Sequence, residues 1–248
     1  DGIPYSCTKT TCTQQHVETY DPPKPGKCYD AKTTNYTFSG CIGSPAYPDN
    51  VSDDNPARIY PGYLNLTCTK TFVPLTSDFT TVKNTINSLT PSDSYTYLPS
   101  GLAWGFNALS SAVPLTEAAA YDSTGRNMNP AKALVLMTDG FNTVNRNPTT
   151  KTSNANFGKH DQATPPKIAT QANTWTAELC ANIKAKNIEV YTVAYQLDST
   201  ITGAPEAKEM LKACASSANN FYDASDAAQL LAAFGQIAED LNNLRLTR

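Results

Sequence analysis

Ala133-Leu-Val-Leu-Met-Thr-Asp-Gly140 is the segment from which the architecture of this chain can be inferred. Five apolar residues are followed directly by a turn signal, Thr138-Asp-Gly140. Short apolar runs that end in a turn are typical of parallel strands, which crossover helices cover on both faces. We therefore expect a strand buried on both faces over residues 133–137, with Asp139 at its carboxyl end.

Helix and strand patterns alternate on both sides of this segment. Apolar residues at helical spacing predict helices over residues 79–89, 102–109, 168–183, 205–214 and 225–244. Runs rich in β-branched and aromatic residues predict strands at residues 188–197 and 221–222, and the polar residues 141–166 predict a long loop. Because strands that alternate with helices form parallel sheets, the predicted fold class is α/β with a partial doubly wound parallel sheet.

The first 74 residues have a different character. Five of the seven cysteines lie among the first 70 residues, in a stretch rich in proline and turn signals. Only two short stretches, at residues 34–38 and 63–68, have the pattern of strands. A region with so few aliphatic residues needs crosslinks rather than a large core. We expect a disulfide-rich, loop-dominated segment over residues 1–74 and an α/β region over residues 75–248.

Cysteine spacing favours disulfides over a zinc site. The first five cysteines are separated by 5, 16, 13 and 27 positions, which gives no pair with zinc-finger spacing, and the chain has only two histidines. Disulfides indicate the periplasm, the cell surface or a secreted protein, and free thiols in the cytoplasm are the alternative. Cys180 and Cys214 fall on consecutive crossover helices and are expected to pair, and Cys41 with Cys68 is a plausible second pair. Because seven is odd, at least one thiol is free or pairs outside the chain.

Composition argues against several classes of protein. Charged residues make up 17% of the chain, and the net charge is −3 without any basic run, which argues against a nucleic-acid partner. No apolar stretch approaches the roughly 18 residues of a membrane span. The chain has no Gly-x-Ser-x-Gly elbow and no phosphate-binding loop, so we expect a protein that is not an enzyme.

Several motifs together resemble a known family. The segments Ala133-Leu-Val-Leu-Met-Thr-Asp-Gly-Phe-Asn-Thr143 and Tyr95-Thr-Tyr-Leu-Pro-Ser-Gly-Leu-Ala-Trp-Gly105 resemble the fourth strand and the threonine loop of a von Willebrand factor A domain. Four further segments narrow the resemblance to TadG-like proteins of bacterial Tad/Flp pilus systems: Leu179-Cys-Ala-Asn-Ile-Lys184, Glu189-Val-Tyr-Thr-Val-Ala194, Leu211-Lys-Ala-Cys-Ala215 and Ile237-Ala-Glu-Asp-Leu241. Gly40-Cys-Ile-Gly-Ser44 and Val73-Pro-Leu-Thr76 also resemble that group. In that group a cysteine-bearing insertion interrupts the A domain, which would be the role of residues 1–74.

The resemblance implies a metal-ion-dependent adhesion site. Thr96 and Asp139 match two oxygen ligands of the family's divalent cation, which would be Mg²⁺, Ca²⁺ or Mn²⁺. An open coordination position of that ion takes an acidic group of a protein partner. The family's Asp-x-Ser-x-Ser loop does not follow a strand anywhere in this sequence, so we expect this chain alone to bind metal weakly or not at all.

The resemblance also implies an incomplete sheet. The first three strands of the family lie upstream of the equivalent of Asp1, so the strand over residues 133–137 would lack its central neighbour. An unpaired apolar strand is an edge that proteins avoid. We therefore expect the missing amino-terminal half of the polypeptide, or another protein chain, to cover it, and an oligomer is compatible with the same argument.

Two functions follow from these expectations. The first is a non-enzymatic adhesion or pilus-assembly module outside the cytoplasm, which binds a protein through an ion-dependent face completed by an upstream segment. The alternative is a structural component of a cell surface or filament, in which residues 1–74 make the contacts and the ion site is vestigial. The odd cysteine, which could crosslink neighbouring molecules, favours the alternative.

Overall fold

The computed structural model describes residues 6–12, 31–64, 71–90, 95–120, 131–146, 160–162 and 169–246. In chain order, the elements are β1 Ser6–Cys12, β2 Ala31–Ile42, β3 Gly62–Leu64, α1 Phe79–Asn87, α2 Leu98–Leu109, β4 Ala133–Thr138, β5 Val144–Arg146, β6 His160–Gln162, α3 Thr170–Ala185, β7 Glu189–Tyr195, α4 Ala204–Cys214, the 3-10 helix η1 Ala218–Asn220, β8 Phe221–Ala224 and α5 Ala227–Leu246. Among the described residues, no helix combines the length and the apolar character that crossing a bilayer requires.

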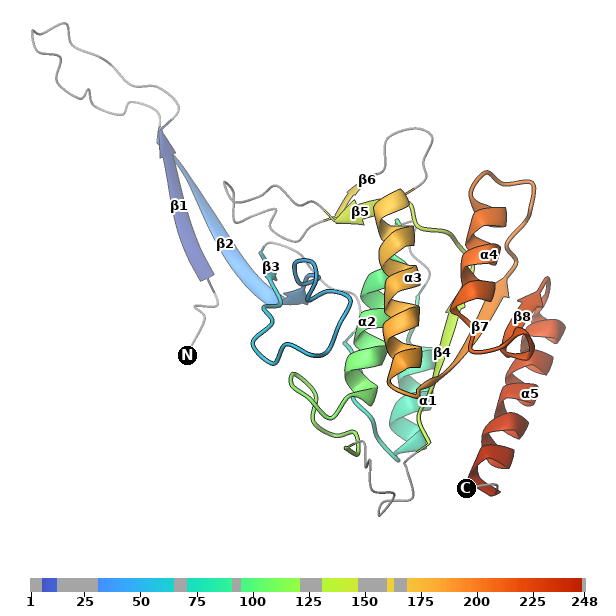
Figure 1. Ribbon diagram of the computed structural model, residues 1–248. Helices are drawn as coiled ribbons and strands as arrows, with labels where there is room; N and C mark the ends of the chain where they lie inside the picture. Colours follow the sequence, from blue (N-terminus) through green and yellow to red (C-terminus); the bar gives the residue numbers. More distant parts are fainter. Residues whose placement is uncertain are drawn as a thin grey trace, which may run out of the picture.

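A three-stranded parallel sheet of order β4-β7-β8 forms the centre of the fold (Figure 1). β4 pairs with β7 from Ala133 opposite Glu189 to Thr138 opposite Ala194, and β7 pairs with β8. The segment between β4 and β7 contains α3, and the segment between β7 and β8 contains α4. Parallel neighbours require such crossovers. The predicted α/β class with a parallel sheet is therefore confirmed.

Helices cover both faces of the central strand, β7. On one face, α2, α3 and α4 surround a large core that includes Leu136 and Val190. On the other face, Ile237 of α5 packs against Tyr191 and Val193. Successive side chains of a strand point to opposite faces, so a strand with apolar residues at every position can contribute to both cores.

The prediction that the strand over residues 133–137 is buried on both faces is wrong for one face of β4. Leu134 and Leu136 are 7% and 8% exposed, whereas Val135 and Met137 are 38% and 46% exposed. The reason is the position of α5, which packs mainly against β7 and β8, so that Ala133 is the one residue on this face of β4 that packs against that core among the described residues. One face of β4 is therefore part of the core, and the other is a partly open apolar surface.

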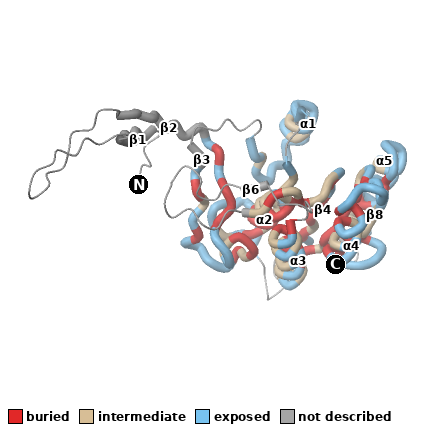
Figure 2. Tube along the Cα trace, turned by 90° about the horizontal axis from the view of Figure 1, so that it is seen from above, coloured by how far each residue is buried: buried red, intermediate tan, exposed pale blue. Residues whose placement is uncertain are grey.

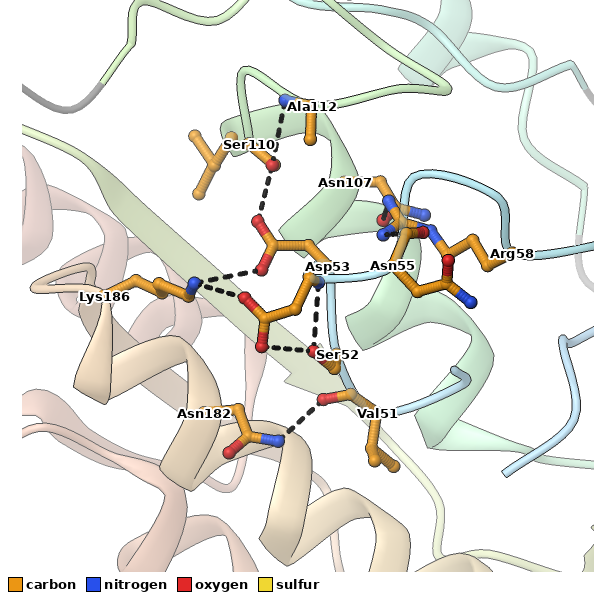
Figure 3. A network of polar contacts seen from close by, with 12 residues as sticks. Val51, Ser52, Asp53, Asn55, Arg58, Asn107, Ser110, Ala112, Asn182 and Lys186 are labelled. Carbon is orange, nitrogen blue, oxygen red and sulfur yellow. Dashed lines mark hydrogen bonds and ion pairs between the residues drawn. The ribbon is translucent and has the colours of Figure 1, made fainter. Parts of the chain in front are cut away.

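Residues 43–61 share a core with the α/β region. Val51 is 1% exposed and belongs to the core cluster of α2 and α3. Its carbonyl oxygen accepts a hydrogen bond from Asn182 Nδ2 at 2.8 Å, and Ser110 Oγ donates to the buried Asp53 Oδ2 at 2.5 Å (Figure 3). Lys186 Nζ lies 3.6 Å from Asp53 Oδ1. This segment is thus fixed to the helices by packing and by polar contacts.

A buried arginine adds a second set of contacts from the same segment. Arg58 is 7% exposed, and its Nη2 donates to Asn107 Oδ1 at 2.9 Å and to the carbonyl oxygen of Val113 at 2.7 Å. Its Nε donates to the hydroxyl of Tyr60 at 2.6 Å. Burying a charged side chain is costly unless its donors are used, and these bonds meet that requirement.

Both parts of the chain contain disulfide-bonded cysteines. Cys180 of α3 and Cys214 of α4 form a disulfide with a Cα–Cα distance of 5.0 Å, as expected from consecutive crossover helices. Cys41 is buried and also disulfide-bonded. The proposed partner of Cys41, Cys68, lies outside the described residues. An antiparallel sheet of order β1-β2-β3 contains the predicted stretch 34–38 and the beginning of the stretch 63–68.

The helix predicted over residues 79–89 is present as α1, but it is not packed. No residue of α1 is buried, and Phe79 and Ile86 are 79% and 59% exposed. Figure 2 shows α1 coloured as exposed or intermediate along its length. Asp78 caps its first turn by accepting a hydrogen bond from the backbone N–H of Thr80. The helical periodicity is therefore correct, although the apolar side of the helix does not face the core.

Candidate functional site

The loop that follows β4 carries Asp139, one of the two residues expected to bind an ion. Asp139 is exposed at the carboxyl end of β4. The hydroxyl of Thr138 donates to the carbonyl oxygen of Gly140 at 2.9 Å and accepts a hydrogen bond from the Gly140 N–H at 3.1 Å. These two bonds close a tight turn around Asp139. Ligands of open α/β sheets bind at this end of the strands.

The structure brings the second expected residue, Thr96, to the same place. The backbone N–H of Thr96 donates to Thr143 Oγ1 at 2.8 Å, and the N–H of Thr143 donates to the carbonyl oxygen of Thr96 at 3.0 Å. A Cβ atom added to Gly140 would lie 3.2 Å from Thr96 Oγ1. The absence of a side chain at Gly140 therefore lets the two loops approach closely. Thr96 and Thr143, which join them, are 47 positions apart in the sequence.

The buried side chain of Asn142 connects the loop after β4 to two helices. It is 2% exposed, and its Oδ1 accepts a hydrogen bond from the N–H of Leu98, at the start of α2, at 2.7 Å. Its Nδ2 donates to Asn173 Oδ1 at 2.9 Å and to Thr176 Oγ1 at 3.3 Å, both on α3. One amide thus connects the loop after β4 with the start of α2 and with the first half of α3.

Asn142 and Thr143 carry no local sequence signal that marks them as positioning residues. Both belong to the segment that carried the family resemblance, but polar residues after a strand read equally well as an ordinary solvated loop. Only the burial of Asn142, together with its three partners, shows that it orders the site. A buried amide with satisfied donors and acceptors contributes to a unique geometry.

The two expected ligands suit a hard divalent cation in type but not in number. A carboxylate and a hydroxyl are the oxygen ligands that Mg²⁺ and Ca²⁺ prefer, yet these ions take six or more ligands. Within the part of the chain that the structure describes, no group of three or more His, Cys, Asp or Glu side chains could hold a metal ion. Thr96 and Asp139 alone therefore do not make a complete ion site.

The open edge of β4 lies next to this loop. Among the described strands, β4 pairs only with β7. The N–H of Glu189 donates to the carbonyl oxygen of Lys132 at 2.9 Å, so Lys132 directs its backbone groups toward β7. Since these directions alternate along a strand, the N–H and C=O groups of Val135 and Met137 point away from β7. The outer edge of β4 therefore presents backbone donors and acceptors beside the exposed side chains of Val135 and Met137.

Comparisons with known proteins give no family. No family model matches the sequence, and no curated protein matches it. One crystal structure of the pilus adhesin SpaC from Lactobacillus rhamnosus GG aligns with 20% identity and a TM-score of 0.46, over 68% of this chain and 22% of the adhesin. A second, in an open conformation, aligns with 18% identity and a TM-score of 0.47, over 80% of this chain and 24% of the adhesin. The chain thus spans about a quarter of the length of these structures.

Proposed function

We propose that this chain is a non-enzymatic adhesion or pilus-assembly module that acts outside the cytoplasm and binds a protein partner. The observation that supports this proposal is the meeting of the Thr96 and Asp139 loops at the carboxyl end of β4, beside a strand edge that no other described strand pairs with. The disulfide between Cys180 and Cys214 suits an oxidising compartment such as the periplasm, the cell surface or the exterior.

The proposed sheet is a von Willebrand factor A-like, doubly wound sheet that is completed by another segment. An upstream part of the polypeptide, or a partner chain, would pair with β4 and supply the oxygen ligands that Thr96 and Asp139 lack. The exposed Val135 and Met137 support this proposal, because strands that bury both faces are apolar at every position. A divalent cation would then be bound at the shared face rather than by this chain alone.

Metal titration tests the ion-dependent part of the proposal. Mn²⁺ added to this chain together with the segment or partner chain that pairs with β4 should bind, and Asp139→Ala and Thr96→Ala should each weaken the binding at least ~10-fold, about 1.4 kcal/mol. Glu206→Ala removes an exposed carboxylate from α4 and serves as the matched control with the same change of charge. Electron paramagnetic resonance of free Mn²⁺ measures the affinity. If Asp139→Ala binds Mn²⁺ as tightly as the parent chain, the ion site is not at this loop.

The alternative function is a structural component of a surface or filament. The observation that favours it is the odd number of cysteines, seven, which leaves at least one thiol for a crosslink between molecules. Electrophoresis of native material without reductant discriminates between the two functions. A ladder of oligomers that collapses on reduction supports the structural role, whereas a monomer under both conditions contradicts it.

A further inference from the structure

A groove of about 370 Å³ lies beside α5 at the edge of the sheet opposite β4. Residues 222–224 of β8 form one wall. The other wall comes from α5 and includes Gln229, Ala232 and Gln236. This groove is separate from the Thr96 and Asp139 loops, and neither the ion site nor the proposed adhesion function uses it.

The strand wall of the groove has unpaired backbone groups. Among the described strands, β8 pairs only with β7. The carbonyl oxygen of Ala224 accepts a hydrogen bond from the N–H of Gln196 at 2.8 Å, so Ala224 faces the end of β7. By alternation, the N–H and C=O groups of Phe221 and Asp223 point outward. A free strand edge of this kind is a template for another extended backbone.

The helix wall leaves room for a peptide and offers amide groups to it. The lining positions 229, 232, 233 and 236 follow helical spacing and therefore share one side of α5. Alanines occupy the middle of this side, and Gln229 and Gln236 stand at its two ends. Gln229 Oε1 accepts a hydrogen bond from the N–H of Ser225, and Gln236 Nε2 donates to Asp240 Oδ1. Among the described residues, Gln229 Nε2 and Gln236 Oε1 have no such partner, so they remain for a ligand.

The polar chemistry of the groove is neutral. The carboxylate of Asp223 is already paired with Lys208 Nζ at 2.9 Å. The hydroxyl of Tyr222 is buried, so a ligand in the groove does not reach it. Burial, followed by the nearby Asp240 carboxylate, raises the pKa of this hydroxyl, so it adds no charge to the groove at neutral pH. Unpaired backbone groups and side-chain amides fit an uncharged extended peptide better than a charged ligand.

We propose that the groove binds a short extended peptide segment of a partner protein, which adds a strand to the outer edge of β8 and lies against α5. Main-chain hydrogen bonds to Phe221 and Asp223 supply affinity, and the alanine side of α5 selects small, uncharged side chains, which is the mode of recognition known as strand addition. Because β8 has only four residues, the added strand is short.

The test uses the intact, disulfide-bonded chain and a displayed library of short random peptides. The consensus peptide is then synthesised and titrated by fluorescence anisotropy. Ala232→Arg fills the groove from an exposed position and should weaken binding at least ~10-fold, which corresponds to about 1.4 kcal/mol. The matched control, Ala238→Arg, adds the same side chain at an exposed position of α5 outside the groove lining and should change the affinity less than about 2-fold.

A second measurement distinguishes strand addition from unspecific adhesion. Methylating alternate backbone nitrogens of the peptide removes the donors of one edge and should abolish binding, whereas methylating the other set should leave it nearly unchanged. The proposal is overturned if no peptide is selected, if both methylated peptides bind, or if Ala232→Arg binds normally. It is also overturned if sedimentation shows a dimer that Ala232→Arg dissociates, because a second copy would then occupy the groove.

Discussion

Gly203 occupies a position that only glycine fits, at the start of α4. Its φ is +98°, and a Cβ atom added there would lie 2.8 Å from the ring of Phe141. The left-handed backbone and the contact with the loop after β4 both oppose any side chain. This residue therefore couples the entry of α4 to the loop that carries the candidate site.

Gly203→Ala should lower the free energy of unfolding by about 1–3 kcal/mol, because it combines an unfavourable φ with a steric clash. Gly101→Ala is the matched control, since Gly101 is an exposed residue of α2 with no atom within 4 Å of an added Cβ. That control should be neutral or stabilise the fold by about 0.5–1 kcal/mol. Urea denaturation measures both, and equal effects of the two substitutions would contradict this explanation.

Asp54 gives the protein a pH-dependent contact at its surface. The hydrogen bond from Lys186 Nζ, at 2.6 Å, and the Ser52 hydroxyl hold the pKa of Asp54 below its ordinary value of 3.8. The same bond raises the pKa of Lys186 above 10.5. A lowered carboxyl pKa stabilises the fold above the unfolded pKa, and this contribution is lost as the pH falls through the folded pKa.

Asp54→Asn should therefore cost about 0.2–1 kcal/mol at neutral pH, a small value because Asp54 is 71% exposed and water screens the pair. The cost should shrink toward zero as the pH falls well below 3.8, and high salt should reduce it at neutral pH. Urea unfolding at neutral and acidic pH provides the comparison. A cost that is the same at both pH values would show that the charge is not responsible.

At the scale of elements, a disulfide joins α3 and α4, the two crossover helices that flank β7 in the sequence. Both sulfur-bearing residues are 1% exposed, and the bond closes a separation of 34 positions that contains β7. Such a crosslink stabilises mainly by restricting the unfolded chain. Replacing both cysteines with serine also leaves two hydroxyl groups in a packed interior.

The double substitution Cys180→Ser with Cys214→Ser should lower the free energy of unfolding by at least about 2–4 kcal/mol. Guanidinium denaturation of the parent, the variant and the parent in reductant measures this loss. The reduced parent should approach the variant, although reductant also acts on the disulfide of Cys41. An unchanged midpoint in the double variant would mean that packing alone holds α3 and α4 together.

At the scale of the whole molecule, the two faces of β4 have opposite roles. Leu136 lies in the core of α2, α3 and α4, whereas Met137 projects from the face that α5 leaves uncovered. Because a charge is costly only where water is excluded, the same substitution should have different effects at these neighbouring positions.

Met137→Lys should change the stability of the isolated chain by no more than about 0.5 kcal/mol. Leu136→Lys, its matched control, should destabilise the chain by about 3 kcal/mol or more, because it buries an unpaired charge. Thermal unfolding provides the measurement. If the upstream segment or a partner pairs with β4 as proposed, Met137→Lys should also weaken that association, as sedimentation of the mixture would show. Equal destabilisation by both substitutions would mean that the outer face of β4 is covered.

The sequence by itself determined the alternation of helices and strands, the parallel α/β class and the pairing of Cys180 with Cys214. These features depend on local periodicity, on the turn after residues 133–137 and on the order of elements along the chain, all of which are visible in one dimension. The choice of Thr96 and Asp139 as candidate ligands depended instead on the resemblance to von Willebrand factor A domains, and the structure places their loops side by side.

Only the tertiary structure decided which surfaces are covered. It showed that α5 packs mainly against β7 and β8 and leaves Val135 and Met137 of β4 exposed, that no residue of α1 is buried, and that Val51 enters the core of α2 and α3. It also showed that Asn142 is a buried connection rather than a solvated loop residue. An apolar or polar residue has the same local pattern whether or not a distant element lies above it, so burial depends on contacts that no short stretch of sequence contains.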